Sequence, residues 1–265
     1  MIESYLDEKR KKIALLIDGD NAQPSLIDKI LAEATKYGLV TIRRIYGDWT
    51  TVNMSGWKNT LHDNAIQPIQ QFRYTIGKNS TDSAMIIDTM DILHSRLVDG
   101  FCIVSSDSDY TRLATRVREM GFFVMGVGKR TTPKAFVNAC QVFIYTENLA
   151  PKMRAPRKPS TSPKGRGQEG REEREGGEEP RPKYDPMPLL KAAFEMAQAE
   201  DGWAELGIIG GYLRQLDPGF DPRSFGFRQL SQLIKSFSGL FDLRYQEDEG
   251  RTDVFVRMRE PAPEA

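Results

Sequence analysis

Carboxylate side chains follow two apolar runs of this sequence. Residues 13–17 (IALLI) lead directly into Asp18, and residues 101–104 (FCIV) are followed within a few positions by Asp107 and Asp109. Apolar runs of this length that end in a turn signal are typical of strands buried on both faces of a parallel sheet. Because ligands bind beyond the carboxyl ends of such strands, we expect these carboxylates to meet at one edge of the sheet.

Two further polar residues join this predicted site. Asn21 lies close behind Asp18, and Asp82 stands at a predicted helix start. Crowded carboxylates repel one another unless protons or a cation intervene, and the cation that suits an all-oxygen cluster is Mg²⁺ or Mn²⁺. Such a site could cleave a phosphodiester in line without a serine, histidine or cysteine nucleophile.

Each acid also has a purely structural interpretation. Asp82 would complement a helix dipole, and Asp107 and Asp109 could cap the helix that follows them. Asp88 and Asp91, on the helix that Asp82 opens, are expected to be solvated or to act indirectly. Capping explains any one of these acids, but it does not predict two apolar strands that both end in aspartate.

Three cations fall in predicted loops or at helix starts that could face the same edge. They are Lys78, Arg130 and Lys134. Each would either contact a phosphate backbone or remain solvated. His62 and His94 are isolated on predicted helices, where we expect surface or packing roles.

The elements that must position these residues alternate along the first 150 residues. Apolar runs predict strands over residues 40–46, 66–72, 122–127 and 142–145 in addition to the two already described. Helical spacing predicts helices over residues 24–37, 55–64, 110–120 and 133–139, and a further helix that begins at Thr81. This alternation favours an α/β fold with a parallel sheet and helices on both faces.

Charge is spread unevenly along a chain whose formal net charge is zero. Residues 1–150 carry 18 basic and 17 acidic side chains, residues 151–183 carry 10 and 6, and residues 184–265 carry 9 and 14. The middle segment lacks apolar periodicity and is dense in Pro, Gly, Glu, Lys and Arg, which predicts a disordered linker. We therefore expect a first domain over residues 1–150 and a second over residues 184–260.

The second domain shows three amphipathic segments and a ribbon. Apolar residues recur at helical spacing over 189–197, 203–216 and 227–237, and residues 240–245 and 252–256 alternate around a turn. Three helices followed by a β-hairpin is the layout of a small winged-helix domain.

The cysteines and the N-terminus bear on the compartment. Cys102 and Cys140 lie in apolar context without metal-ligand spacing, as buried reduced thiols do. The N-terminal segment is charged, and the apolar run behind it is too short for a signal peptide or a membrane span. We expect a cytoplasmic protein.

Three motifs of the first domain resemble the NYN domain, a branch of the PIN-like metal-dependent nucleases. They are residues 17–21 (IDGDN), 77–84 (GKNSTDSA) and 104–110 (VSSDSDY). The resemblance implies a PIN-like three-layer α/β/α sandwich, Mg²⁺ or Mn²⁺ as cofactor, and RNA cleavage. It also implies that Asp18, Asp82, Asp107 and Asp109 bind the metal, with Asn21 as the family's polar residue beside the first aspartate.

The second domain is similar to the OST-HTH, or LOTUS, domain. The matching residues are 202–207 (GWAELG), 220–227 (FDPRSFGF) and 230–234 (LSQLI). The resemblance implies a winged-helix module that binds RNA or a protein partner. The acidic balance disfavours general attraction to phosphates, but a local basic face with Arg223, Arg228 and Lys235 could still contact RNA.

The leading interpretation is a metal-dependent ribonuclease whose second domain holds RNA or an RNA-bound partner. A non-catalytic RNA-binding or scaffold protein is the alternative. Phosphatase chemistry of the haloacid-dehalogenase type is suggested by the sequence DGD at residues 18–20, but the serine or threonine expected two residues later is Ala22.

Overall fold

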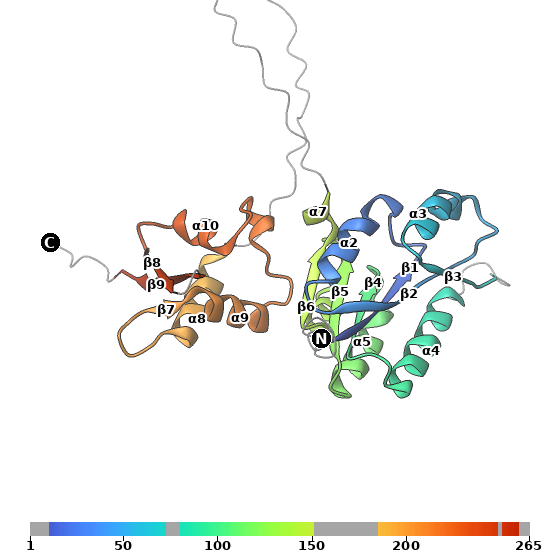
Figure 1. Cartoon of the computed structure of the whole chain (residues 1–265), viewed down its shortest axis with the longest axis horizontal. Helices are drawn as coiled ribbons and strands as arrows, with labels where there is room; N and C mark the ends of the chain where they lie inside the picture. The colour runs from blue at the N-terminus through green and yellow to red at the C-terminus, as the bar shows by residue number, and fades with distance from the viewer. Residues whose placement is uncertain (1–10, 73–79, 151–184, 249–250, 260–265) are drawn as a thin grey trace, which may run out of the picture.

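A computed structural model describes residues 11–72, 80–150, 185–248 and 251–259 of the chain. The described residues form an N-terminal part, residues 11–150, and a C-terminal part, residues 185–259, each with its own sheet (Figure 1). The predicted linker, residues 151–183, lies outside the described residues. The domain boundaries at residues 150 and 184 therefore stay predictions.

The N-terminal part is built on a six-stranded sheet in the order β3-β2-β1-β4-β5-β6. Every neighbouring pair of strands in it is parallel. The strands are β1 (Lys12–Asp18), β2 (Leu39–Gly47), β3 (Gln67–Gln70), β4 (Gly100–Val104), β5 (Phe123–Gly128) and β6 (Val142–Tyr145). Apart from shifts of a few residues at their ends, these are the six strands that the apolar runs predict.

Helices cover both faces of this sheet (Figure 1). They are α2 (Ile27–Ala34), α3 (Lys58–Asp63), α4 (Ser80–Ser95), α5 (Tyr110–Glu119), α6 (Lys134–Ala139) and the short α7 (Thr146–Leu149), with 3-10 turns η1 (Pro24–Leu26) and η2 (Val52–Trp57). Alternate residues of β1 point to opposite faces, as the period of a strand requires. Leu15 joins the core beneath α2 and η2, whereas Leu16 joins the core beneath α4, α5 and α6. The predicted PIN-like three-layer α/β/α sandwich is confirmed.

Strand order reverses between β1 and β4. From β1 the chain builds outward through β2 to β3, and then returns to place β4 on the other side of β1. At such a reversal the helices that follow the two strands cover opposite faces, which leaves a crevice at the carboxyl ends of the strands. Asp18 and Asp107 follow these two strands, so the topology brings both to this crevice.

Two predicted helices differ from the observed elements. The helix predicted over residues 24–37 begins as η1 and ends at Ala34, because the chain then turns so that Tyr37 stacks on Phe123 at a ring distance of 5.1 Å. At Gly38 a side chain would lie 2.2 Å from the Lys11 carbonyl oxygen, so only glycine fits there. The helix predicted over residues 55–64 is divided between η2 and α3.

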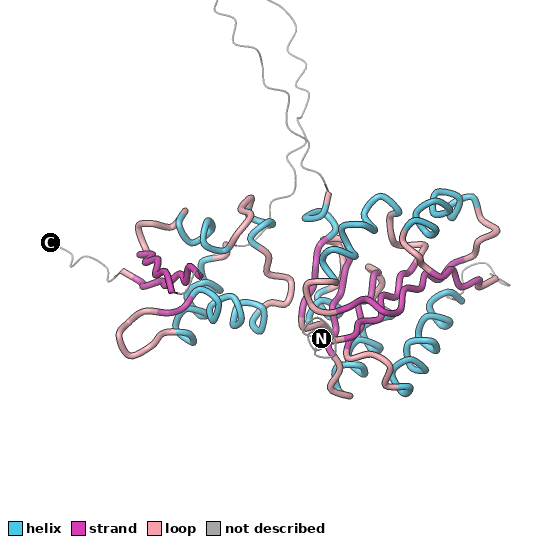
Figure 2. Tube along the Cα trace, viewed as in Figure 1, coloured by secondary structure: helices cyan, strands magenta, loops and turns pink. Residues whose placement is uncertain are grey.

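The C-terminal part has helices packed on a small antiparallel sheet (Figure 2). Its elements are α8 (Met187–Ala197), β7 (Ala204–Glu205), α9 (Leu206–Leu216), η3 (Pro222–Phe225), α10 (Leu230–Lys235), β8 (Phe241–Asp248) and β9 (Arg251–Met258). The predicted three helices and ribbon are present. The sheet has the order β7-β9-β8, because a two-residue strand that the sequence pattern does not reveal pairs with β9.

The two parts contact each other along the edge strand β6. The Phe143 amide donates a hydrogen bond to the Pro218 carbonyl oxygen at 2.8 Å. The Arg223 guanidinium pairs with the Glu33 carboxylate of α2 at 2.5 Å. Edge strands expose unpaired backbone groups, so the first of these contacts covers part of an otherwise open edge.

Candidate active site

Asp18 ends β1 at the crevice and is almost completely buried, with 1% of its surface exposed. Its carboxylate accepts hydrogen bonds from the Asn21 amide at 2.6 Å, the Ser105 hydroxyl at 2.8 Å and the Asp20 backbone N–H at 3.1 Å. Burial raises the pKa of Asp18 above its ordinary value, and these hydrogen bonds oppose the increase. The predicted pairing of Asn21 with the first aspartate is thus a direct contact.

The turn after Asp18 requires glycine. The Gly19 N–H donates to the Tyr46 carbonyl oxygen of β2 at 2.9 Å. A side chain at Gly19 would lie 2.8 Å from the same backbone oxygen, and backbone cannot move aside as a flexible side chain can. This close approach of two strand ends fixes the direction in which Asp18 enters the crevice.

Three carboxylates meet at the mouth of the crevice. Asp82 comes from the first turn of α4, and Asp107 and Asp109 come from the loop between β4 and α5. One carboxylate oxygen of each residue lies within 4.8 Å of the other two. Burial raises the pKa of Asp82, and the charges of Asp107 and Asp109 raise it further. The structure therefore brings together three of the four predicted metal-binding carboxylates.

Asp18 is not a member of this group of three. Asp18 is close enough to the site for the charge of Asp82 to raise its pKa. Both of its oxygens already accept hydrogen bonds from the protein. The Asp18 carboxylate is therefore enclosed by the protein, and it is poorly placed to act as the exposed nucleophile of a phosphatase.

Ser105 connects Asp18 to the cluster and was not among the predicted site residues. Its hydroxyl donates to Asp18 and accepts a hydrogen bond from the Asp107 backbone N–H at 3.0 Å. The Asp109 N–H in turn donates to the Asp107 carboxylate at 2.9 Å. A hydroxyl directly after a buried apolar strand was the available signal in the sequence. It was missed because its two partners come from different strand ends.

Tyr110 was also missed as a site residue. It begins α5, is completely buried, and donates its hydroxyl to an Asp82 oxygen at 2.7 Å. Burial and the nearby carboxylates raise the pKa of Tyr110, so it is a neutral hydrogen-bond donor. This contact ties the start of α4 to the start of α5 and holds Asp82 toward the other two acids.

The residues of the cluster fit a divalent metal ion. All three offer carboxylate oxygens, which are the ligands that hard cations prefer. The like charges that raise the pKa of Asp82 are the charges that a bound cation would neutralise. Asp82, Asp107 and Asp109 are therefore the residues that would hold such an ion.

Asp88 also lies on α4, and its side chain contacts the sheet. Its carboxylate accepts hydrogen bonds from the Arg44 guanidinium and the Tyr46 hydroxyl, both on β2. These hydrogen bonds hold the middle of α4 against the sheet, C-terminal to Asp82. Asp91 on the next turn is exposed. Of the two predicted alternatives for Asp88, a solvated or an indirect role, these contacts favour the indirect role.

The predicted phosphate-contacting cations of the N-terminal part occupy different settings. Arg130 donates to the Asn148 side chain at 3.0 Å and lies over the Tyr145 ring, so its guanidinium already has partners inside the protein. Lys134 begins α6 and is exposed. Lys78 lies outside the described residues. Contact of these residues with RNA stays a prediction.

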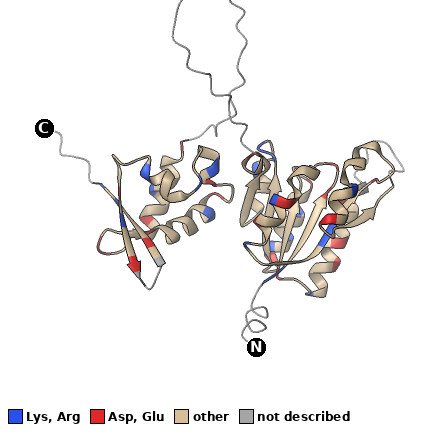
Figure 3. Ribbon diagram, turned by 45° about the horizontal axis from the view of Figure 1, so that its top comes forward, with Lys and Arg blue, Asp and Glu red and all other residues tan. Residues whose placement is uncertain are grey.

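The predicted basic face of the C-terminal part is only partly available. Arg223 forms ion pairs with Glu33 and Asp221, so its guanidinium is used within the chain. Arg228 and Lys235 are exposed. Figure 3 shows basic and acidic segments interspersed on both parts, which agrees with the nearly balanced charge.

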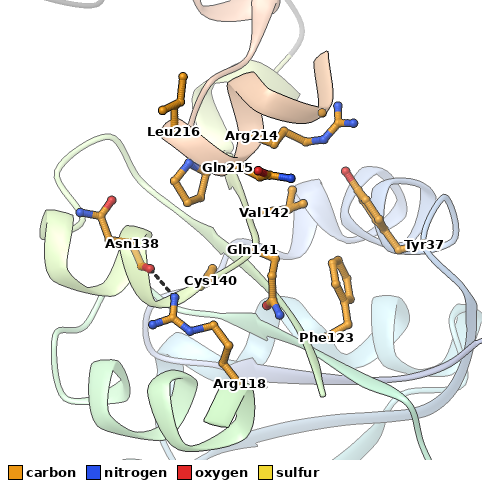
Figure 4. Close-up of a pocket in the computed structure, with 12 residues that line it drawn as sticks. Tyr37, Arg118, Phe123, Asn138, Cys140, Gln141, Val142, Arg214, Gln215 and Leu216 are labelled. Carbon is orange, nitrogen blue, oxygen red and sulfur yellow. Dashed lines mark hydrogen bonds between the residues drawn. The ribbon is translucent and has the colours of Figure 1, made fainter. Parts of the chain in front are cut away.

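A cavity of about 580 Å³ lies at a distance from the carboxylates (Figure 4). It is lined by Phe123 and Val142, at the starts of β5 and β6, and by Arg214 and Leu216 of α9. The carboxylates follow the opposite, carboxyl ends of the strands. The lining of the cavity lacks the acidic residues that the predicted chemistry needs.

Comparison with known proteins gives two matches to family models. The NYN domain model matches residues 12–148, a little over half of the chain, and the OST-HTH/LOTUS domain model matches residues 184–251. No curated protein matches the chain. In the described residues, no helix combines the length and the apolar character needed to cross a membrane.

Solved structures match at low similarity. A protein of unknown function from Vibrio parahaemolyticus is 19% identical, with a TM-score of 0.43, over 51% of this chain and 91% of that one. An uncharacterized protein from Nitrosomonas europaea is 24% identical, with a TM-score of 0.29, over 44% and 97%. Residues 175–257 of a Chromobacterium violaceum protein are 30% identical, with a TM-score of 0.26, over 31% and 89%.

NYN domains are nucleases and OST-HTH/LOTUS domains bind RNA, so both family matches relate the chain to RNA. The matched ranges contain the acidic cluster and the three-stranded sheet, respectively. The chain belongs to the NYN domain family, and its C-terminal part is an OST-HTH/LOTUS domain.

Proposed function

We propose that the protein is a ribonuclease that hydrolyses RNA phosphodiester bonds with Mg²⁺ or Mn²⁺ as cofactor. One observation carries the proposal: the carboxylates of Asp82, Asp107 and Asp109 converge within 4.8 Å at the crevice where the strand order reverses. Helix capping would place acids at helix starts, but it would not bring acids from two different helix starts together. Membership in the NYN domain family, whose members are nucleases, also supports the proposal.

The chain's own residues have separable tasks in this proposal. Asp82, Asp107 and Asp109 would hold the cation, which supplies Lewis-acid stabilisation of charge on the phosphodiester. Tyr110 and Ser105 fix the orientation of these ligands through the hydrogen bonds described above. Ligands held in this way need little reorganisation when the substrate binds, which is the main protein contribution to such catalysis.

Asp18 would contribute a buried negative charge close to the ligand Asp82. Its hydrogen bonds with Asn21 and Ser105 keep it oriented toward the crevice. A negative charge that is near the ligands but not one of them raises the affinity of a carboxylate site for a cation. The OST-HTH/LOTUS domain would hold the RNA, or a partner that carries it, while the cluster acts.

The test is cleavage of single-stranded and structured RNA by the purified chain in Mn²⁺ or Mg²⁺, with EDTA as the metal-free control. Asp107→Asn should reduce the rate at least a hundredfold, as loss of one electrostatic group in a catalytic site commonly does. Asp91→Asn, an exposed acid of α4 outside the cluster, should cleave like the wild type.

Two results would contradict the proposal. Wild-type cleavage by Asp107→Asn would show that the cluster is not the catalytic site. Retention of RNA without any metal-dependent product would instead support the alternative, a non-catalytic RNA-binding protein.

A further inference from the structure

The three-stranded sheet of the C-terminal part has one face in the core and one face in solvent. Ala204 of β7 and Val256 of β9 pair with each other and lie in the core. Because side chains alternate along a strand, their neighbours point to the solvent face. Arg244 of β8 and Arg257 of β9 are exposed there.

A partly exposed aromatic ring lies beside the two arginines of this face. Trp203, directly before β7, has the guanidinium carbons of Arg257 and Arg244 at 4.8 and 4.6 Å from its ring centroid. The Arg244 guanidinium also lies 5.2 Å from the Phe255 ring. We call these four residues, Trp203, Arg244, Phe255 and Arg257, the tryptophan platform.

We propose that the tryptophan platform binds single-stranded RNA by stacking its bases. Unpaired bases stack on aromatic rings and on the planes of arginine side chains, which are the two surfaces that the platform combines. The arginines would also contact the phosphates between the stacked bases. Bases inside a duplex are already stacked and hidden, so the platform should discriminate against double-stranded RNA. The inference rests on the proposed function, since it identifies where that enzyme would hold its substrate.

The charges around the platform support this assignment. Asp242 pairs with Arg259 at 2.7 Å and with Arg257 at 3.5 Å, so part of the basic charge is neutralised. Arg244 contacts two aromatic rings and, among the described residues, has no carboxylate within ion-pair distance. An acidic domain can thus bind RNA through one local cation and a ring rather than through its net charge.

The platform offers RNA a different surface from the predicted basic face of Arg223, Arg228 and Lys235. Arg223 forms ion pairs with two carboxylates, which leaves Arg228 and Lys235 as the exposed cations of that face. These two side chains offer phosphate contacts and one guanidinium plane, but they do not themselves supply an aromatic ring. The platform combines an exposed cation with an aromatic ring at one place in the fold.

The experiment measures binding of the full-length chain to a fluorescent single-stranded RNA of mixed sequence by anisotropy, in EDTA so that no cleavage can occur. Trp203→Ala should weaken binding roughly tenfold, because one base loses the ring on which it stacks. Trp203→Phe should retain most of the affinity. Tyr245→Ala removes an exposed aromatic ring from the opposite face of the same sheet and should bind like the wild type.

A duplex of the same RNA should bind less tightly to the wild type and should be insensitive to Trp203→Ala. If Trp203→Ala does not fold, the exposed pair Arg244→Gln and Arg257→Gln decides the question, with a loss of several-fold or more expected. Wild-type affinity in all platform variants that fold would overturn the inference. Because binding is measured without metal, that failure is distinct from an absence of metal-dependent cleavage, which would overturn the proposed function.

Discussion

The hydroxyl groups of Ser105 and Tyr110 donate hydrogen bonds to the carboxylates of Asp18 and Asp82, respectively. Burial disfavours the ionised form of both carboxylates. Burial raises the pKa of both Asp18 and Asp82, and the hydrogen bonds from these hydroxyls lower it again. The hydrogen bonds compensate for burial only in part, because both pKa values remain above their ordinary range. In the absence of a cation, the ionised cluster therefore destabilises the folded state, as is common where a site is built for a ligand.

Asp82→Asn should raise the melting temperature in EDTA at pH 7 by a few degrees. The folded-state pKa of Asp82 lies above the ordinary value of 3.8, so the folded chain releases this proton less readily than the unfolded chain. The resulting cost is absent well below pH 3.8, grows as the pH rises from 3.8 toward the raised pKa, and is constant above it. Asparagine keeps the oxygen that accepts the Tyr110 hydrogen bond, so the substitution removes mainly charge.

Thermal unfolding between pH 3.5 and 7, with and without Mn²⁺, provides the measurement. The stabilising effect should shrink toward low pH, and Mn²⁺ should stabilise the wild type more than the variant. Asp91→Asn is the matched control and should change little. A variant less stable than the wild type at pH 7 in EDTA would contradict the expected repulsion.

The sequence predicted the helices and strands that depend on the local pattern of apolar residues. The runs that form β1 and β4 are continuously apolar, and their burial on both faces follows from composition alone. The strand β7 has two residues and exists only because Ala204 and Glu205 pair with β9, so local pattern cannot reveal it. Tertiary contacts also decide the early end of α2, where Tyr37 leaves the helix to stack on Phe123.

The candidate site shows the same division. Four acids were predicted to converge, and three of them lie within 4.8 Å of one another, since parallel strand ends and their following helices share one edge. The hydrogen bonds of Ser105 and Tyr110 depend on distances between residues far apart in the sequence, as does the Arg44 contact of Asp88. Spacing in a sequence defines neighbours within an element but not partners between elements.

The anchor of α4 on β2 gives a prediction at this scale. Asp88→Ala should lower the free energy of unfolding by about 1–3 kcal/mol, because Tyr46 and Arg44 lose a charged acceptor in a half-buried setting. RNA cleavage should fall as well, since α4 also carries Asp82. Urea unfolding measures the first effect and the cleavage assay the second. Equal effects of Asp88→Ala and the exposed Asp91→Ala would show that the network does not hold the helix.

For the whole molecule, the contact between the two parts determines where the C-terminal part stands relative to the cluster. Arg223 was predicted to contact RNA, but its guanidinium pairs with Glu33 of α2 and with Asp221 of its own part. A side chain at Gly219 would lie 2.7 Å from the Tyr145 hydroxyl, so the two parts also approach closely at this point. Interfaces of this kind within one chain are typically modest, and one ion pair can be a large share of their stability.

Arg223→Glu should therefore separate the two parts, since it places a third negative charge beside Glu33 and Asp221. Small-angle X-ray scattering should show a radius of gyration larger by a few ångströms than in the wild type. Arg228→Glu makes the same charge change at an exposed residue nearby and should leave the radius unchanged. If the two variants scatter alike, the ion pair does not hold the parts together. If Arg223→Glu scatters like the wild type but binds RNA less tightly, the predicted RNA contact of Arg223 describes its role better than the interface does.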